Sequence, residues 1–393
     1  MTVSGTGRMA VLAALCGLAI LPARAGSEGN AERRINEIVS IGTAESYKQR
    51  LSPMLSALVK MGSPADARKL DFEMPAITAQ LDAGARLLSF DVAYDPKGGQ
   101  LKSPAGAIMS GAMLSDSFSA QMAKPGFKTV HVLDIDFQSN CQPLTECLKV
   151  IRAWSEKHPD HVPVLVSLTT NDKKTPMPRA TEPAKIDAAA LNALDAEVRM
   201  TLGDRLLTPD TVRMSYPDMR TALAKNGWPT LAQARGHILV VLNDAPGKLA
   251  LYLGKQNTLK NRSMFVTVPE NNSNAAIIAM ADPVKNAAAI TAAVKSGFIV
   301  VTRADCETME ARANDTRRRD VALRTGAQYI ATNFLFPDKA IGSYQVRLIT
   351  APQTAQIAEA SPQPLRAAFQ VPANALPPQP VRLAPQSNVL QPW

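Results

Sequence analysis

The sequence has 393 residues, with a formal net charge of +9, 46% hydrophobic residues and 20% charged residues. This composition excludes a disordered, collagen-like or fibrous protein, and the length suits one large domain or two small ones. The basic excess is mild, and no run of Lys and Arg is interleaved with aromatic residues. Nucleic acid is therefore not an expected partner, whereas peripheral contact with an anionic membrane surface is compatible with the charge.

Residues 1–25 have the pattern of a secretory signal peptide. A short basic start ends at Arg8, the apolar run Met9–Leu21 follows, and Ala23–Ala25 (ARA) has the form that a signal peptidase cleaves. The apolar run is shorter than the roughly 20 residues that a membrane-spanning helix needs, although an N-terminal anchor helix remains the alternative. We expect a mature protein that is secreted or periplasmic and has no transmembrane span.

The other end of the chain differs from the middle in composition. Residues 351–393 are rich in Pro, Ala and Gln and contain nine prolines without periodicity. Such a segment is typical of a disordered or loosely extended tail. Residues 26–350 are then the expected folded domain.

The middle of the chain contains eight short apolar segments rich in β-forming residues. They are Ile35–Ile41, Arg86–Val92, Lys128–Leu133, Pro163–Thr169, His237–Asn243, Arg262–Val268, Phe298–Thr302 and Ala327–Thr332. Near-continuous apolar runs indicate strands that are buried on both faces. Helical patterns lie between several of them, at Leu144–Lys157, Ala188–Leu202 (with Asp187 as a candidate N-cap) and Asn286–Ser296.

This alternation predicts an α/β fold of the TIM type, a (β/α)₈ barrel. An open doubly wound sheet is the alternative, but no Gly-rich phosphate loop follows the first strand. In a barrel, the chemistry is expected at the carboxyl ends of the strands. The polar residues predicted at those ends are Thr43, Glu45, Ser89, Asp91, His131, Asp134, Asp136, Thr169–Asp172, Asn243, Asp244, Arg303, Asp305 and Asn333.

Cys141 and Cys147 lie six positions apart around Pro143. In an oxidising compartment they can close a small disulfide loop, which leaves Cys306 unpaired in the mature chain. Their spacing and number do not match a zinc site.

Six sequence motifs, in this order and spacing, resemble a known family. They are N-E-I-x-x-I-G-T-x-x-S-Y-K (Asn36–Lys48), Q-L-D-A-G-x-R followed by D-V-x-Y-D-P (Gln80–Arg86 and Asp91–Pro96), H-V-x-D-I-D-F-x-S-N-C (His131–Cys141), G-W-P-T-L (Gly227–Leu231), T-R-A-D (Thr302–Asp305) and E-A-R-A-N-D-T-x-R-R-D (Glu310–Asp320). Together they resemble the secreted bacterial calcium-dependent phosphoinositide phospholipase C family, from about Ile35 to about Phe336. The resemblance implies a (β/α)₈ phosphodiesterase that cleaves a phosphoinositide.

The resemblance also implies a mechanism. In the family, one histidine removes the proton of the inositol 2-hydroxyl, a second protonates the leaving diacylglycerol oxygen, and Ca²⁺ held by oxygen ligands stabilises the phosphate charge. The first histidine and an Asn ligand belong to a G-T-H-N-S-Y motif after the first strand. Carboxylates from two further strands complete the metal shell.

Several of these positions are substituted in this sequence. Ala44 takes the place of the first histidine and Glu45 that of the Asn ligand, while Ser89 and Thr169 replace two metal carboxylates. His131 corresponds to the second histidine and Asp91 to a retained ligand. We therefore take His131 and Glu45 as candidate catalytic residues, and Asp91 and Glu45 as candidate ligands of a depleted Ca²⁺ site. Ser89 and Thr169, with Arg303, are candidate substrate-binding residues.

Some of these residues have a simpler interpretation that stays open. Arg303 is equally suited to gripping a phosphate and to an ion pair with Asp305. Asp134 and Asp136 are more typical of loop caps than of ligands. Arg317, Arg318 and Arg319 form the densest basic cluster and are more typical of a solvated helix face than of a phosphate site.

Two functions follow from this reasoning. The first is an exported phosphodiesterase of the phosphoinositide phospholipase C type with reduced or altered activity. The second is a catalytically inactive barrel that binds a phosphorylated or polyol ligand. Losing a general base costs about 10²–10⁴ in rate, so the substitutions bear directly on the choice between the two.

Overall fold

The computed structural model describes residues 32–348 and 358–359. The predicted signal peptide lies outside the described residues, as does the predicted tail except for Ala358–Glu359. These two residues form β10, which pairs antiparallel with β1. Within the described part of the chain, no helix is long and apolar enough to cross a membrane.

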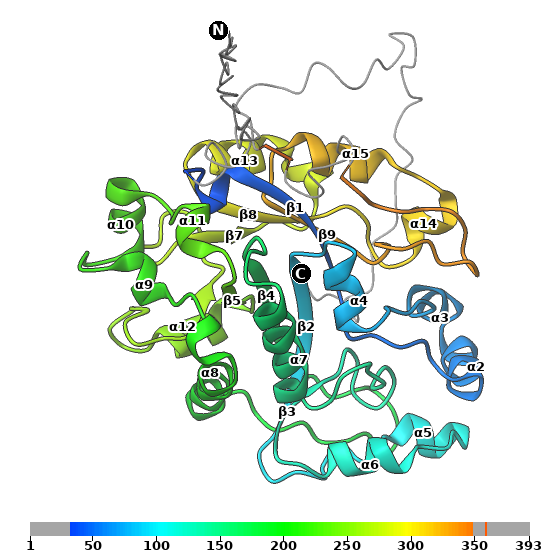
Figure 1. Ribbon diagram of the computed structural model, residues 1–393. Coiled ribbons are helices and arrows are strands. Elements are labelled where there is room, and N and C mark those ends of the chain that lie inside the picture. The colour runs from blue at the N-terminus through cyan, green and yellow to red at the C-terminus, as the bar shows by residue number, and fades with distance from the viewer. Residues whose placement is uncertain (1–31, 349–357, 360–393) are drawn as a thin grey trace, which may run out of the picture.

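The strands lie at the centre of the molecule (Figure 1). They are β1 (Ile38–Thr43), β2 (Leu87–Asp95), β3 (Gly126–Thr129), β4 (Val164–Thr170), β5 (Ile238–Leu242), β6 (Phe265–Val266), β7 (Ile277–Ala279), β8 (Ile299–Arg303) and β9 (Tyr329–Thr332), in addition to β10.

Helices surround these strands on the outside. The α-helices are α2 (Pro53–Gly62), α3 (Pro64–Lys69), α4 (Ile77–Asp82), α5 (Ala105–Ser110), α6 (Asp116–Met122), α7 (Leu144–Lys157), α8 (Ala188–Leu202), α9 (Pro209–Arg213), α10 (Met219–Asn226), α11 (Leu231–Ala234), α12 (Pro246–Leu253), α13 (Pro283–Lys295), α14 (Met309–Ala313) and α15 (Arg317–Arg324); short 3₁₀ turns lie at η1 (Ile35–Glu37) and η2 (Gly203–Arg205). The predicted helices at α7 and α8 are confirmed, and the Asp187 side chain accepts from the Ala190 amide as the N-cap of α8.

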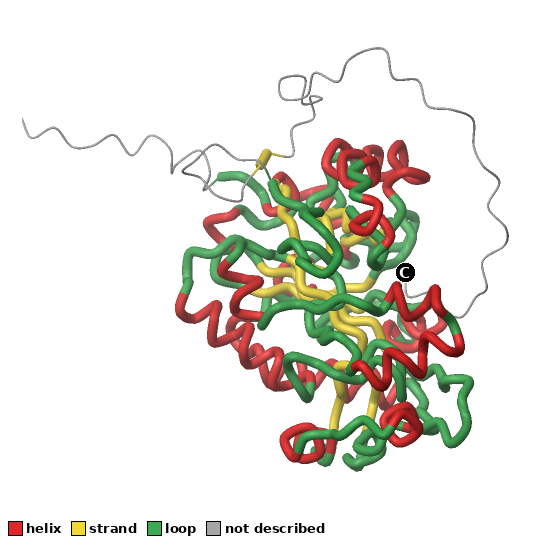
Figure 2. The backbone as a smooth tube through the Cα atoms, turned by 90° about the vertical axis from the view of Figure 1, so that its right-hand side faces the viewer, coloured by secondary structure: helices red, strands yellow, loops and turns green. Residues whose placement is uncertain are grey.

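Eight of the strands form a parallel barrel, as predicted. Their order is β6-β5-β4-β2-β1-β9-β8-β7, and a single parallel bridge between Thr267 and Ile277 links the two ends. Figure 2 shows the strands gathered at the centre with helices around them. A closed ring of parallel strands with outer helices is the (β/α)₈ architecture, and it excludes the open doubly wound sheet.

One predicted strand does not belong to the barrel ring, and one strand of the ring was not predicted. The prediction that Lys128–Leu133 is a barrel strand is wrong, because β3 pairs antiparallel with the far half of β2, from Val92↔Thr129 to Asp95↔Gly126. The long strand β2 extends past the barrel ring, and β3 pairs with this extension. The eighth barrel strand is β7, whose three residues form too short a run to be recognised in the sequence.

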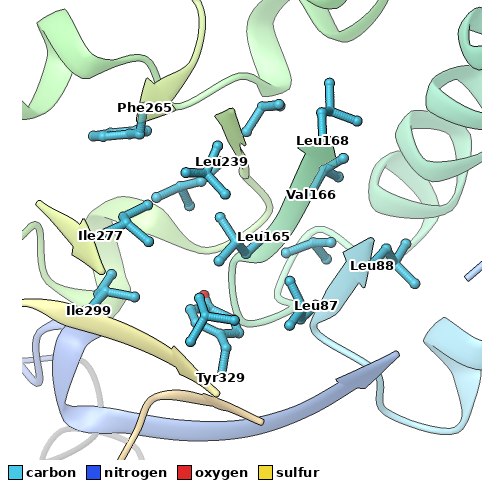
Figure 3. Packing of buried hydrophobic residues seen from close by; sticks show 14 of the residues in the cluster. Leu87, Leu88, Leu165, Val166, Leu168, Leu239, Phe265, Ile277, Ile299 and Tyr329 are labelled. Carbon is cyan, nitrogen blue, oxygen red and sulfur yellow. The ribbon is translucent and has the colours of Figure 1, made fainter. Parts of the chain in front are cut away.

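The barrel interior changes from apolar to polar along its axis. Leu87, Leu165 and Leu239 are paired in register, and Figure 3 shows them pointing inward with Ile277, Ile299 and Tyr329. Because alternate residues of a strand share a face, the next inward positions on β2 are Ser89 and Asp91. The apolar layer fills the barrel at the amino ends of the strands. The polar side chains therefore gather at the carboxyl ends of the strands.

A close approach between β1 and β2 explains why position 42 is a glycine. A Cβ atom built on Gly42 lies 2.2 Å from Leu87 Cβ and 2.4 Å from the Leu87 carbonyl oxygen. Only a residue without a side chain allows the two strands to pair at this point. This contact sets the position of the loop that follows β1.

Candidate active site

The loop after β1 is held by a buried network of hydrogen bonds. Gln80 Nε2 donates to the Ser46 carbonyl oxygen at 2.7 Å, and the Thr43 hydroxyl donates to Gln80 Oε1 at 2.6 Å. Ser46 Oγ accepts from the Ser89 amide at 2.8 Å, which ties the loop to β2. The network fixes the backbone of the two residues that this loop presents, Ala44 and Glu45.

Ala44 and Glu45 are both buried, at 3% and 8% exposure. The methyl group of Ala44 can neither accept nor donate a proton. Glu45 has a positive φ of 50°, and no residue in the described ranges hydrogen-bonds to its Oε2 atom. A buried carboxylate oxygen without a partner is costly, and such atoms are concentrated at functional sites. Glu45 is therefore the residue of this loop that is free to act on a ligand.

His131 is paired with Asp91 across β2 and the segment after β3. His131 Nδ1 lies 3.0 Å from Asp91 Oδ2, and the Tyr47 hydroxyl donates to the same oxygen at 3.0 Å. The backbone also holds His131 here, because the Val130 amide donates to the Asp91 carbonyl oxygen and Asn171 Nδ2 donates to the His131 carbonyl oxygen. The imidazole is thus oriented with one nitrogen committed to a carboxylate.

Asp136 approaches the same place from the turn after His131. The His131 amide donates to the Asp136 carbonyl oxygen at 3.1 Å, which keeps the two residues side by side. Asp136 Oδ2 lies 2.8 Å from Lys48 Nζ, and both side chains are shielded from solvent, at 1% and 0% exposure. Asp136 therefore carries an internal counter-ion.

Glu45, His131 and Asp136 converge in space. One ligand atom of each lies within 4.8 Å of those of the other two. Burial alone would lower the pKa of His131, but the negative charges of Glu45, Asp91 and Asp136 outweigh this effect and raise the pKa to about 9. An imidazole with such a pKa is suited to donating a proton at neutral pH.

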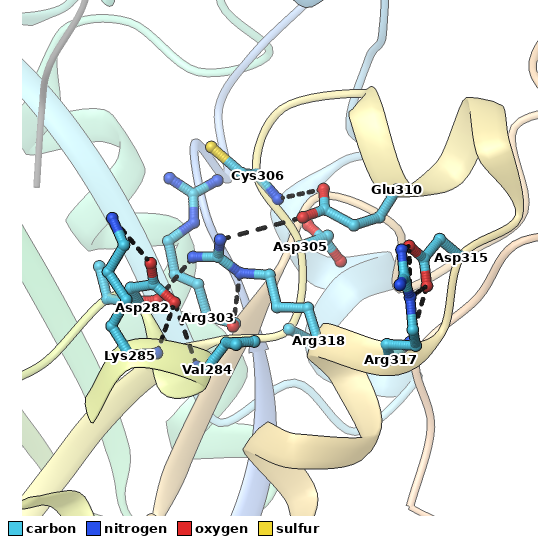
Figure 4. Close-up of polar contacts among 12 residues, drawn as sticks. Asp282, Val284, Lys285, Arg303, Asp305, Cys306, Glu310, Asp315, Arg317 and Arg318 are labelled. Atoms are coloured by element: carbon cyan, nitrogen blue, oxygen red, sulfur yellow. Dashed lines mark hydrogen bonds and ion pairs between the residues drawn. The ribbon is translucent and has the colours of Figure 1, made fainter. Parts of the chain in front are cut away.

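Arg303 lies at the carboxyl end of β8 and is 6% exposed. Its Nη2 donates to Asn333 Oδ1 at 2.9 Å, while its Nε has no hydrogen-bond partner within the described ranges. Asp305 accepts instead from the Thr332 hydroxyl and the Asn333 amide, and the Arg303 side chain extends away from it (Figure 4). Arg303 is thus left with donors for an anionic ligand.

The basic cluster on α15 has local partners. Arg317 pairs with Asp315, and Arg319 pairs with Asp320. Arg318 donates to the carbonyl oxygens of Arg303 and Ala281 and lies 3.9 Å from Glu310, so that it supports the loop after β8 (Figure 4). These residues stabilise the loop and do not form a separate phosphate site.

Ser89 and Thr169 lie on neighbouring strands near Asp91. The ladder pairs Ser89 with Ser167 and Asp91 with Thr169, so that all four share one face. Ser89 is 6% exposed, and its Oγ has no partner among the described side chains. The two substituted positions thus contribute hydroxyl groups to a layer that borders the Asp91–His131 pair.

The structure brings together Glu45, His131 and Asp91. The predicted role of a loop cap fits Asp134, which accepts from the Ala105 and Thr181 amides, whereas Asp136 joins the cluster. Asp136 and its partner Lys48 stand inside the quoted motifs His131–Cys141 and Asn36–Lys48, and this is the signal that the sequence offers for them.

A disulfide closes the segment that follows this site. It joins Cys141 to Cys147, with Cα atoms 5.3 Å apart, and leaves Cys306 as a free thiol. The Thr129 hydroxyl donates to the Cys141 carbonyl oxygen at 2.8 Å, so that the closed loop is anchored to β3.

The fold and the site define a parallel α/β barrel with a histidine–carboxylate cluster at the carboxyl ends of its strands. The chain belongs to the family described as Phosphoinositide phospholipase C, Ca²⁺-dependent, whose model matches residues 33–357. No curated protein sequence matches the chain.

Several solved structures are similar at low sequence identity. A calcium-dependent phosphoinositol-specific phospholipase C from Pseudomonas sp, solved as a myoinositol complex, is 15% identical (TM-score 0.48; 78% of this chain, 92% of that chain). A Ca²⁺-dependent phosphatidylinositol-specific phospholipase C from Streptomyces antibioticus is 16% identical (TM-score 0.47; 77% and 95%). The phosphatidylinositol-specific phospholipase C from Listeria monocytogenes is 12% identical (TM-score 0.44; 79% and 92%).

The side chains of this site supply few free oxygen ligands for a calcium ion. Calcium takes about six to eight oxygen ligands, whereas two of the three carboxylates here already have protein partners. Asp91 Oδ2 accepts from Tyr47 and pairs with His131, and Asp136 is bound to Lys48. Among the described residues, Glu45 Oε2 and Asp136 Oδ1 are buried carboxylate oxygens of this cluster with neither a hydrogen bond nor an ion pair, and His131 offers an imidazole nitrogen, which suits softer metals.

Proposed function

We propose that the protein is an exported phosphodiesterase that cleaves a phosphoinositide, or another phosphodiester of a polyol, at a reduced rate. The observation that carries this proposal is the cluster of Glu45 and His131, with the imidazole oriented by Asp91. A proton acceptor and a proton donor within a few ångströms of each other are what phosphodiester cleavage by general acid–base catalysis needs. The pattern of residues 1–25 supports export.

In the proposed reaction, the inositol 2-hydroxyl oxygen attacks phosphorus and the bond to the diacylglycerol oxygen breaks. Glu45, whose Oε2 has no partner within residues 32–348, receives the hydroxyl proton. His131 donates its proton to the leaving oxygen, and Asp91 stabilises the charged imidazole that precedes this transfer. The products are a cyclic inositol phosphate and diacylglycerol. No step involves calcium.

Arg303 supplies positive charge for the phosphate in this proposal. Its Nη2 is held by Asn333, and its Nε is unpartnered among the described groups. A guanidinium with free donors can bind phosphate oxygens with good geometry. Ser89 and Thr169 then contribute hydroxyl groups for the polyol ring.

The reduced rate has a physical reason. A carboxylate is a weaker base than the imidazole that Ala44 replaces, because the unperturbed Glu pKa is about 4.3 and the unperturbed His pKa about 6.5. Ala44 itself, 3% exposed, would support the second candidate, an inactive barrel that binds a phosphorylated polyol. The same assay separates the two candidates.

The test is to incubate purified protein with phosphatidylinositol vesicles and to measure cyclic inositol phosphate. The proposal predicts slow turnover that falls by about 10²-fold or more in Glu45→Gln. The matched control is Glu197→Gln, because Glu197 on α8 is also a Glu with an unpartnered oxygen but accepts from the Phe127 amide, away from this site. Saturable binding without any product would instead establish the binding function.

A further inference from the structure

Lys48 is a lysine with no solvent exposure, and it lies next to the acidic cluster. Its backbone is fixed on both sides: its amide donates to the Glu45 carbonyl oxygen, and its own carbonyl oxygen accepts from the Met74 amide, both at 2.9 Å. Its Nζ lies 5.0 Å from the centre of the Phe72 ring and 3.3 Å from the Gln49 carbonyl oxygen. A buried ammonium is retained only where such partners replace water.

The partner that matters most is Asp136. Lys48 Nζ lies 2.8 Å from Asp136 Oδ2, and Asp136 contributes one of the three ligand atoms that could surround a metal ion. The Lys48 ammonium group lies beside that position. Because like charges repel each other, it disfavours a divalent cation there.

Arg303 adds a second cationic side chain near the cluster, because it interacts electrostatically with Glu45. A divalent cation in the cluster would therefore be repelled by Arg303 as well as by Lys48.

We propose that Lys48 is the internal cation of this site: it holds Asp136 in place and occupies the electrostatic position that calcium would otherwise take, so that the pocket is independent of divalent cations. Lys48 is a positioning residue, since it reaches the ligand only through Asp136. The inference deepens the proposed function, on which it rests for the ligand, but its central claim concerns metal binding and can be measured without substrate.

The experiment is a calcium titration of the full chain by isothermal calorimetry, together with thermal unfolding at millimolar calcium and in chelator. The wild-type protein is expected to show no binding heat and no shift in unfolding temperature. Lys48→Met removes the ammonium but keeps the volume of the side chain, and it is expected to gain calcium affinity by at least about tenfold, with a higher unfolding temperature in calcium. Lys128→Met is the control, because the Lys128 side chain is also unexposed but donates, within the described ranges, to the Lys124 and Gly126 carbonyl oxygens and to no carboxylate.

A second variant covers the case in which Lys48→Met folds poorly. Lys48→Met/Asp136→Asn removes both charges, and it is expected to unfold at a higher temperature than Asp136→Asn alone and to bind no calcium. Tight calcium binding by the wild-type protein would overturn the proposal, and so would equal calcium affinity in the wild type and in Lys48→Met. Loss of phosphodiesterase turnover without any change in these two results would instead count against the proposed function alone.

Discussion

Asp91 Oδ2 lies 3.0 Å from His131 Nδ1, although the two residues are 40 positions apart in the chain. The pairing arises because β3 folds back antiparallel on β2, so that the Val130 amide donates to the Asp91 carbonyl oxygen at 2.9 Å. A carboxylate in this position both orients the imidazole and stabilises its protonated form.

Replacing Asp91 by Asn tests this relationship. The amide removes one negative charge next to His131, and the pKa of the imidazole is therefore expected to fall below its wild-type value of about 9. Turnover is expected to drop by about 10²-fold or more. An NMR titration of the His131 ring measures the pKa, and Asp95→Asn is the control, because Asp95 on the same strand accepts from the Gly98 and Gln100 amides instead. An unchanged His131 titration in Asp91→Asn would contradict this account.

Ala44→His restores the type of residue that the family resemblance places at this position. We expect this single change to raise turnover by less than about tenfold, well short of the 10²–10⁴ that a working general base contributes. The reason is that the surrounding carboxylates stay bound to Tyr47, His131 and Lys48. Full restoration of activity by this one substitution would show that the rest of the site is intact.

His161 provides a prediction on pH and stability. Burial, with Arg86 and Arg205 nearby, lowers its pKa to about 4, and its Nε2 lies 2.7 Å from Ser155 Oγ. The folded-state pKa is below the unfolded value of about 6.5, so the stabilisation is present above pH 6.5 and is lost as the pH falls toward 4. Urea unfolding is expected to show a loss of up to about 3 kcal/mol over this range. The loss should shrink in His161→Gln, and an equal loss in both proteins would refute the assignment.

Gly42→Ala tests the contact that positions the active-site loop. Its Cβ would lie 2.2 Å from Leu87 Cβ, and we expect a loss of about 3 kcal/mol or more in the free energy of unfolding. Gly247→Ala is the matched control, since no heavy atom lies within 4 Å of the added Cβ. That substitution lies in α12 and should be neutral or stabilising by up to about 1 kcal/mol. Equal effects of the two changes would show that the strand contact is not restrictive.

The barrel could be predicted because buried parallel strands leave a strong pattern. Seven of the apolar runs coincide with strands of the ring, and helices α7 and α8 follow their periodicity. The segment at Lys128–Leu133 reads as a barrel strand in the sequence because an apolar run does not reveal its partner or its direction, and its strand pairs antiparallel with β2 instead. The strand β7 was missed because three residues are too few to show a period.

The site could be predicted only in part, for a related reason. Glu45, Asp91 and His131 stand at strand ends or directly after them, where the topology brings side chains together. Lys48 and Asp136 lie in loops 88 positions apart, and their ion pair depends on how those loops fold over the barrel. A motif match marks such positions but does not indicate which of them are neutralised by a partner.

The most direct measurement is the initial rate of cyclic inositol phosphate formation from phosphatidylinositol vesicles, compared in chelator and in millimolar calcium. With Glu45 and His131 as the proton-transfer pair and Lys48 as the internal cation, the rate should be slow and equal in the two conditions. A rate that vanishes in chelator and returns with calcium would contradict the account.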